Sequence, residues 1–198
     1  MTLPTLVSLA DVAPQAWRNG GGRTRELLRW PLAKHDNATW VLRISVADIE
    51  SDGPFSVFPG VQRWFAVIDG VGVVLHFADG ERALAPDAAP LRFDGGMAPG
   101  CTLVDGPTRD LNLMVRGGAG RMQAVEPGVA WDAPLAVRAL YTAVAGTWHA
   151  EDTRRDLAAG TLLWSGTAGD AAWQFDPADA GVDLRAWWLG VDLPRAAR

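Results

Sequence analysis

Cysteine and histidine are scarce in this sequence of 198 residues. The one cysteine, Cys101, cannot form a disulfide within the chain, and no cysteine pair has the spacing of a structural zinc site. The three histidines, His35, His76 and His149, stand far apart, whereas a metal-dependent jelly roll needs several histidines with a carboxylate. We therefore expect no metal and no cofactor, and we expect His76, in an apolar run, to be a buried imidazole with hydrogen-bond partners.

Long apolar runs and an excess of basic charge are also missing. No run reaches the roughly 18 apolar residues that span a bilayer, and the first 17 residues lack the basic start and apolar core of a signal peptide. The formal net charge is −5 and the pI is about 5.1, so the chain has no basic field to attract nucleic acid or an anionic membrane. We expect a soluble, cytoplasmic protein that binds neither.

The glycine-rich segments lack the residues of nucleotide-binding and nucleophile motifs. WRNGGGRTRE (17–26) has three consecutive glycines but not the Lys and Ser/Thr of a P-loop. GVGVVL (70–75) lacks the third glycine of a dinucleotide fingerprint, and no G-x-S-x-G elbow marks a serine nucleophile. Two interpretations of the triple glycine stay open: a turn that begins a strand, or backbone that approaches another group closely.

Runs of six to ten residues with alternating apolar side chains dominate the chain, separated by Gly, Pro and Asp. This pattern predicts an all-β sandwich or barrel with many short strands. Asp69-Gly70, between two apolar runs, predicts a hairpin, and DGPFSVFPG (52–60) predicts a shaped loop anchored by its aromatic residues. Helices are expected only near residues 8–13 and 152–158.

Polar residues share one face on two of the predicted strands. Arg43 and Ser45 lie two residues apart, as do Asp110 and Asn112, and side chains alternate across a strand. In a closed barrel this face is the lumen, where Arg43 and Arg63 would bind a carboxylate. A solvated outer face, or structural hydrogen bonds among loops, is the alternative interpretation.

Five blocks, in this order, closely resemble the HutD/Ves family: W-x-N-G-G-G-x-T-x-E from Trp17, R-x-S-x-A from Arg43, D-G-P-F-S-x-F-P-G from Asp52, then Arg63, and D-L-N-L-M from Asp110. The resemblance covers about residues 14–116, and Leu111 stands where family members commonly carry Phe. It implies a cupin-type fold, a bicupin of two linked β-barrel halves, which we place at 1–118 and 119–198. It also implies an association with the control of histidine utilisation in bacteria.

The polar faces and the resemblance together define a candidate site for a small anionic metabolite such as formylglutamate, in a noncatalytic protein. The predicted ligand-binding residues are Asn19, Arg43, Ser45, Ser56, Arg63, Asp110 and Asn112. The predicted pocket-shaping residues are Trp17, Gly20, Gly21, Gly22, Glu26, Phe55 and Met114. We expect Asn19 and the triple glycine on the rim, Trp17 behind the loop as its anchor, and Glu26 paired with an arginine of the same wall.

Two other functions and one assembly stay open. A metal-free cupin enzyme of the isomerase or epimerase type needs a positioned acid and base, for which Tyr141 and His76 are nominal candidates. A protein-interaction module would fit the ten tryptophans if they form an exposed indole patch. A homodimer would use a sheet edge or an apolar barrel flank.

Overall fold

The computed structural model describes residues 3–30, 40–167 and 171–192, so His35 lies outside the described residues. Its regular elements are nearly all β-strands, which confirms the predicted all-β class. The 3-10 helix η1 (Leu9–Asp11) lies where a short helix was predicted. The second predicted helix is wrong: residues 152–158 contain strand β15 (Thr153–Leu157), whose exposure alternates along the chain. Within the described ranges, no helix has the length and apolar character to cross a membrane.

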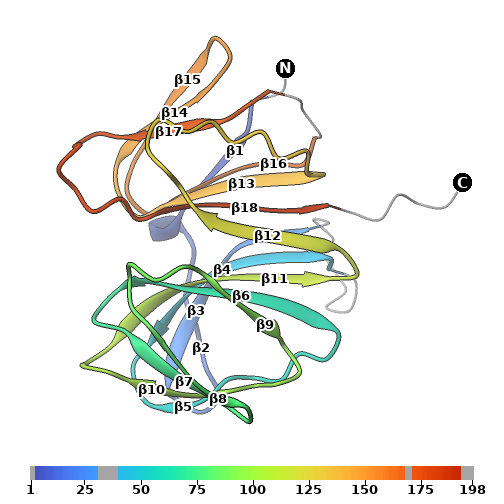
Figure 1. The fold of residues 1–198 in the computed structure, drawn as a ribbon, viewed down its shortest axis with the longest axis vertical. Coiled ribbons are helices and arrows are strands. Elements are labelled where there is room, and N and C mark those ends of the chain that lie inside the picture. Colours follow the sequence, from blue (N-terminus) through green and yellow to red (C-terminus); the bar gives the residue numbers. More distant parts are fainter. Residues whose placement is uncertain (1–2, 31–39, 168–170, 193–198) are drawn as a thin grey trace, which may run out of the picture. The chain divides into compact units, whose positions relative to one another are not determined.

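The chain divides into two compact units, each built from two antiparallel sheets (Figure 1). We call Val12–Gly117 the N-barrel, and Met1–Asp11 together with Gly118–Arg198 the C-barrel. The division falls after Gly117, which has a φ of +68° that favours glycine. The first residues belong to the C-barrel because strand β1 (Thr5–Ser8) pairs with strand β16 (Thr161–Ser165).

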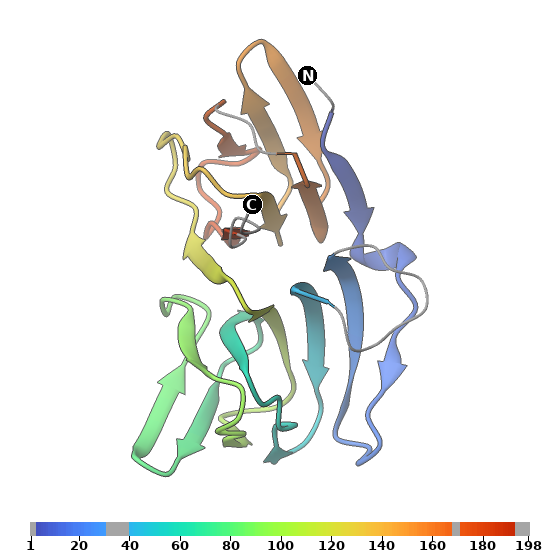
Figure 2. The same cartoon turned by 90° about the vertical axis from the view of Figure 1, so that its right-hand side faces the viewer.

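The N-barrel has a six-stranded sheet in the order β2-β3-β4-β11-β6-β9 and a four-stranded sheet in the order β5-β10-β7-β8. Figure 2 shows the green β7–β8 hairpin on the opposite side of this barrel from the blue strands β2 and β3. The strands are β2 (Gln15–Ala16), β3 (Gly22–Trp30), β4 (Leu42–Ile49), β5 (Gly53–Pro54), β6 (Val61–Asp69), β7 (Val73–Phe77), β8 (Gly80–Leu84), β9 (Leu91–Asp94), β10 (Gly100–Leu103) and β11 (Thr108–Arg116).

The C-barrel has a five-stranded sheet in the order β1-β16-β13-β18-β12 and a three-stranded sheet in the order β15-β14-β17. Its strands besides β1, β15 and β16 are β12 (Ala119–Ala124), β13 (Val137–Thr142), β14 (Gly146–Ala150), β17 (Gln174–Pro177) and β18 (Ala186–Asp192). All pairings in both barrels are antiparallel, so alternate residues of each strand point to opposite faces.

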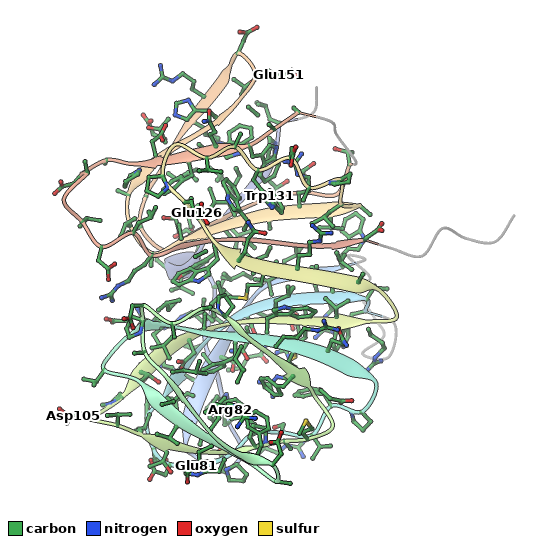
Figure 3. All side chains as sticks on the ribbon, in the orientation of Figure 1. Glu81, Arg82, Asp105, Glu126, Trp131 and Glu151 are labelled. Atoms are coloured by element: carbon green, nitrogen blue, oxygen red, sulfur yellow. The ribbon has the colours of Figure 1, made fainter. Side chains whose placement is uncertain are left out.

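Tryptophan fills the inside of the C-barrel. Trp131, labelled in Figure 3, stacks on Trp188 with ring centroids 5.1 Å apart and contacts Trp173 edge-on. The Arg138 guanidinium lies 4.9 Å from the Trp131 ring and 4.6 Å from the Trp173 ring. It donates to the backbone carbonyls of Ala171 and Trp131 at 2.7 and 2.8 Å. This buried cation is therefore held by carbonyl oxygens and indole faces.

The hairpin predicted around Asp69-Gly70 is wrong. Strand β6 pairs with β11 and β9, whereas β7 pairs with β10 and β8, so the chain passes here from one sheet to the other. Gly70 has a φ of +95°, and a Cβ there would lie 2.7 Å from the Pro107 carbonyl oxygen. The glycine thus permits a sheet crossing, while Asp79-Gly80, ten residues later, forms the tight β7–β8 turn.

The triple glycine forms the turn between β2 and β3, and its members have different steric roles. The amide of Gly20 donates to the Trp17 carbonyl, and the φ of Gly20 is +73°. A Cβ at Gly21 would lie 3.2 Å from Ser51 Oγ. A Cβ at Gly22 would collide with the Asp48 carbonyl oxygen and lie 3.2 Å from the Trp17 ring. The turn therefore needs glycine for close backbone packing against β4.

Asp48 joins three strands of the six-stranded sheet. Its carboxylate accepts hydrogen bonds from Arg23 at 2.9 Å and Arg25 at 2.7 Å, both on β3, and from Arg109 on β11 at 2.7 Å. Burial by itself raises the pKa of Asp48, but the hydrogen bonds from Arg23, Arg109 and Arg25 outweigh it and lower this pKa to about 2. Asp48 is therefore ionised at neutral pH and stabilises the folded sheet.

We predict that Gly22→Ala destabilises the protein more than Gly20→Ala does. The Gly20 variant places alanine at a positive φ in open space, which costs about 1 kcal/mol. The Gly22 variant forces a backbone shift at Asp48, which costs about 3 kcal/mol. Urea unfolding of both variants measures the difference, and equal losses would contradict this role for Gly22.

We predict that Asp48→Asn lowers the free energy of unfolding at pH 7 by about 1–3 kcal/mol, because it removes the charge from three hydrogen bonds. The folded-state pKa of about 2 lies below the ordinary 3.8, so the carboxylate's contribution is complete above pH 3.8 and disappears as the pH falls through about 2. Urea unfolding from pH 7 down to pH 2 should show the two proteins converging. A constant difference over that range would contradict the assignment.

Candidate functional site

The N-barrel contains a cavity of about 840 Å³, a volume within the usual range for small-molecule sites. The lumen face of β4, β11 and β6 forms one wall, and the β2–β3 turn and the loop around Phe55 complete the lining. Predicted ligand-binding residues that line this cavity are Asn19, Arg43, Ser45, Ser56, Arg63 and Asn112. Predicted pocket-shaping residues that line it are Trp17, Phe55 and Met114. Their part in binding a ligand stays a prediction.

Strand register explains why these polar residues meet. Met114 on β11 pairs with Arg43 on β4 at one side and with Arg63 on β6 at the other. Two residues along the same face, Asn112 pairs with Ser45 and with Phe65. The strand face that carries Arg43 and Ser45 therefore points into the barrel lumen, which was the first interpretation of the sequence, and not to the outside.

Arg63 is the most unusual residue of the cavity. It is only 5% exposed, and it donates from Nη2 to Asn112 Oδ1 at 2.9 Å. Its Nε and Nη1 atoms are buried and have no hydrogen-bond partner in the part of the chain that the structure describes. Burial, together with the nearby charge of Arg43, lowers the pKa of Arg63 to about 10. Arg63 therefore remains a cation at neutral pH, without a carboxylate partner among the described residues.

Three phenyl rings surround this guanidinium. Its Cζ atom lies 4.8 Å from the ring centroid of Phe55, 5.7 Å from that of Phe58 and 5.1 Å from that of Phe93. Phe55 also packs on Phe65 with centroids 5.4 Å apart. The loop is fixed to the segment before β10 by hydrogen bonds from the Phe55 and Phe58 amides to backbone carbonyls. This confirms the predicted loop anchored by its aromatic residues.

Arg43, in contrast, already has a carboxylate partner. Its Nε donates to Glu26 Oε2, and Arg29 contributes hydrogen bonds of 3.0 and 3.1 Å to the same carboxylate. The predicted pairing of Glu26 with an arginine of the same wall is therefore present, although Glu26 does not itself line the cavity. Glu26 holds the side chain of Arg43, and its pocket-shaping role stays a prediction.

Two further polar groups of the wall, on Asn112 and Ser45, can donate hydrogen bonds. Asn112 uses its Oδ1 to accept from Arg63, so its amide nitrogen is left to donate. Ser45, also lining the cavity, has no side-chain hydrogen-bond partner within the described residues. A wall that combines two guanidiniums, an amide N–H and a hydroxyl suits an anion.

At the rim, Trp17 anchors the β2–β3 turn as predicted, because its indole Nε1 donates to Thr24 Oγ1 at 2.8 Å. Asn19 lines the same cavity as Arg43 and Arg63, and its Oδ1 accepts from the Gly21 amide at 3.1 Å. The three glycines are absent from the lining of the described cavity. Their requirement is steric, within the turn, rather than contact with the cavity.

Asp110 is separated from the other predicted ligand-binding residues, since it is fully buried and does not line the cavity. The strand is irregular at this point, with a register shift against β6 between Arg109 and Asp110. Thr108 donates to Asp110 Oδ2 at 2.9 Å. Burial raises the pKa of Asp110 well above its ordinary value, only partly offset by the Thr108 hydrogen bond. The carboxyl lies inside the barrel, away from the residues that line the cavity.

The nominal acid and base lie elsewhere. Tyr141 is buried on β13 of the C-barrel, and His76 is on β7 of the N-barrel. His76 is not the predicted buried imidazole: its side chain is 41% exposed, between Glu81 and Thr102. Cys101 is buried, and burial together with Asp110 and Asp52 raises its thiol pKa to about 12. Among the described lining residues there is no Asp, Glu, His, Cys, Lys or Tyr.

Neither a metal site nor an indole patch stands out in the described ranges. They contain no group of three or more His, Cys, Asp or Glu side chains placed to hold a metal ion. Eight of the ten tryptophans are buried and the other two, Trp17 and Trp30, are half-buried. The exposed indole patch expected of an interaction module is therefore absent from the described surface.

Sequence reasoning left several lining residues out of the site. Gln15 and Arg18 come from the segment just before the triple glycine, and Phe58 and Val57 come from the loop that was identified through Phe55. The signal for Phe58 was present in the DGPFSVFPG block, which holds two phenylalanines three residues apart. Arg18 is exposed and has no pattern that distinguishes it from a surface arginine.

Comparison with known proteins gives full-length matches among solved structures. A conserved protein of unknown function from Pseudomonas aeruginosa PAO1 is 26% identical, with a TM-score of 0.84, over 96% of this chain and 100% of that chain. HutD from Pseudomonas fluorescens SBW25 is 26% identical, with a TM-score of 0.80, over 96% of this chain and 99% of that chain. A Bacillus subtilis oxalate decarboxylase is 11% identical, with a TM-score of 0.62, and the match covers 97% of this chain and 78% of that chain. That last likeness concerns the cupin fold alone.

A curated relative from Pseudomonas putida, an uncharacterised 21.2 kDa protein in the hutC 3′ region, is 40% identical over 111 residues. The match covers 55% of this chain and 56% of the relative, so the chain spans about half the length of that relative. The sequence model of the HutD family matches residues 9–181. The match extends through both barrels, and the chain belongs to the HutD family.

Proposed function

We propose that this protein is a noncatalytic binding protein whose N-barrel cavity takes a small anionic metabolite. One observation carries the proposal: Arg63 is a buried cation that lines a cavity and has no carboxylate partner among the described residues. Burying an unpaired charge costs several kcal/mol, so a fold that keeps one gains from an anion placed beside it.

The C-barrel provides an internal comparison. There the buried guanidinium of Arg138 donates to two backbone carbonyls between two indole rings, in an interior filled by tryptophan. In the N-barrel, Arg63 lines a cavity with donor groups on its wall. Two terminal nitrogens of Arg138 thus donate to protein carbonyls, whereas Arg63 has Asn112 as its protein acceptor among the described residues and lines a cavity.

The composition of the lining favours binding over chemistry. General acid–base catalysis needs a titratable group within hydrogen-bond reach of the reacting atoms, and the described lining offers only guanidiniums. Tyr141 and His76 do not line the cavity. These observations support a binding protein rather than a metal-free isomerase or epimerase.

Family membership suggests the metabolite and its context. The HutD/Ves resemblance connects the chain with the control of histidine utilisation, and formylglutamate is the ligand suggested by that connection. Formylglutamate is a small acid with two carboxylates. This suits a cavity whose lining includes the buried Arg63 and the exposed Arg18. Binding of formylglutamate would make the protein a sensor of a pathway acid.

We predict that Arg63→Met weakens formylglutamate binding about 10- to 100-fold, because a charged hydrogen bond to the ligand is lost. Titration calorimetry against formylglutamate, glutamate and glutarate measures the affinities. Arg116→Met is the matched control, since its guanidinium also lies over an aromatic ring, 4.8 Å from the Trp40 ring centroid, but does not line the cavity.

The stability of the Arg63→Met variant separates binding from folding. A buried cation is replaced by an apolar side chain of similar length, so the melting temperature without ligand should stay within a few degrees of the parent. A folded parent protein that binds none of the acids would refute the proposed function. Equal weakening by Arg63→Met and Arg116→Met would refute the assignment of the site.

We predict that Asn19→Ala weakens binding by about threefold to tenfold with little change in melting temperature. Asn19 is exposed on the rim, and its side-chain hydrogen bond is local, from the Gly21 amide. Calorimetry and a thermal melt of the same preparation measure both quantities. A large loss of stability with unchanged affinity would show that Asn19 serves only the turn.

A further inference from the structure

A threonine, a histidine and a glutamate form a connected row on the outer face of the four-stranded sheet of the N-barrel. His76 lies on β7, Glu81 on β8 and Thr102 on β10, so each comes from a different strand. Leu75 and Cys101, which precede His76 and Thr102 along two of these strands, belong to the core of the barrel. Because side chains alternate along a strand, the three polar side chains face the solvent. Glu81, labelled in Figure 3, is on the outside of this barrel.

The strand register brings the three side chains within reach of one another. His76 pairs directly with Glu81 on one side and with Gly100 on the other. Thr102 is the next residue of β10 on the same face, and such diagonal neighbours are within reach of an aromatic side chain. A Cβ at Gly100 would lie 3.7 Å from His76 Cδ2. Glycine at this position therefore leaves the imidazole room to turn toward Thr102.

The two hydrogen bonds of the imidazole determine its tautomer. Nδ1 of His76 lies 3.1 Å from Glu81 Oε1, and Nε2 lies 2.9 Å from Thr102 Oγ1. An ionised carboxylate only accepts hydrogen bonds, so Nδ1 carries the proton of the neutral ring. Nε2 is then the acceptor, and the Thr102 hydroxyl donates to it. The hydroxyl proton is thus directed at a base, which is the arrangement that activates a nucleophilic hydroxyl.

The row is open to a reagent from solvent, but it lacks one feature of a complete hydrolytic site. The side chains of His76 and Glu81 are 41% and 70% exposed. The amide of Leu103, next to Thr102, already donates to Asp52 Oδ1 at 2.8 Å, so it is not free to stabilise an oxyanion. An acyl group on Thr102 would therefore be hydrolysed slowly, and we expect a stoichiometric modification rather than turnover.

We infer that Thr102 is a covalent modification site whose hydroxyl accepts an acyl group from an activated donor, such as an acyl phosphate, a thioester or an activated ester. His76 is the general base, and Glu81 is the positioning residue that fixes its tautomer. The three residues do not line the N-barrel cavity, so this inference goes beyond the proposed function and does not depend on it.

The acyl transfer balances without any further reactant. Thr102 Oγ1 attacks the carbonyl carbon of the donor while its proton passes to Nε2 of His76. The new bond between Oγ1 and the acyl carbon replaces the bond between that carbon and the leaving group, which departs with the electron pair. The imidazolium then gives its proton to the leaving group or to water. The products are an acyl ester of Thr102 and the free leaving group.

The C-barrel contains a matched pair of residues without this connection. Thr147 and His149 lie two residues apart on β14, so they share a face of the three-stranded sheet. Thr147 Oγ1 donates to Asp156 Oδ1 at 2.9 Å, and His149 Nε2 lies 3.1 Å from Asp176 Oδ2. The Thr147 hydroxyl is thus directed at a carboxylate and not at an imidazole. Thr147 therefore serves as the control acceptor.

The test incubates the full chain with p-nitrophenyl acetate, and separately with acetyl phosphate, and locates acetyl groups by peptide mass spectrometry. Thr102 should be acetylated at least about tenfold faster than Thr147, because general base catalysis contributes about 100-fold or more. Peptide mapping separates both from acetylation of Lys34, the one lysine of the sequence.

Variants assign the roles within the row. His76→Gln should slow acetylation of Thr102 by about 100-fold, since the base is lost. Glu81→Ala should slow it by about tenfold, since the imidazole loses the partner that fixes its tautomer. Thr102→Ser should keep the reaction because it keeps the hydroxyl. Thr147→Val should leave acetylation of Thr102 unchanged, and thermal melts verify that each variant is folded.

Three outcomes would overturn the inference. The first is a folded parent protein with no acetyl group on Thr102, and the second is equal acetylation of Thr102 and Thr147. The third is a release of p-nitrophenolate that depends on His76, persists in Thr102→Val and leaves Thr102 unmodified in the parent, because the imidazole itself would then be the nucleophile. If His76→Gln does not fold, the comparison of Thr102 with Thr147 within the parent protein still decides. Failure of formylglutamate binding would overturn the proposed function and leave this inference standing.

Discussion

The buried charge of Arg63 is the constraint on which the candidate site depends. A guanidinium at 5% exposure needs compensation, and the N-barrel supplies only part of it through Asn112 and three phenyl rings. The neighbouring Arg43 adds repulsion, which Glu26 reduces by holding Arg43. The cavity, the donor groups and the aromatic loop are all arranged around this one incompletely satisfied cation.

The two barrels use buried arginine in different ways. In the C-barrel, Arg138 and the stacked indoles of Trp131 and Trp188 fill the interior with protein atoms. The N-barrel instead combines a rigid sheet, fixed across β3, β4 and β11 by Asp48, with a wall of donors. The two buried guanidiniums therefore differ in their surroundings: carbonyl oxygens and indoles for Arg138, phenyl rings and a cavity wall for Arg63.

Much of the fold could be predicted from the sequence because strand alternation is a local property. The face shared by Arg43 and Ser45, the aromatic loop at Phe55 and the anchoring role of Trp17 all follow from spacing along the chain. The HutD resemblance added the bicupin architecture. The prediction of a helix at 152–158 was wrong because apolar and polar residue types alternate only weakly in that part of the sequence. Pairing with β14 determines that the segment forms a strand.

Tertiary structure alone decided which of these residues share a cavity. Spacing placed Asp110 on one face with Asn112, but its full burial keeps its carboxyl out of the lining. Sheet pairing likewise turned Asp69-Gly70 into a crossing between sheets and left His76 exposed. The sequence determined the strands and their polar faces, because alternation is local. The cavity around Arg63 depends on residues far apart in the chain, which only pairing and packing bring together.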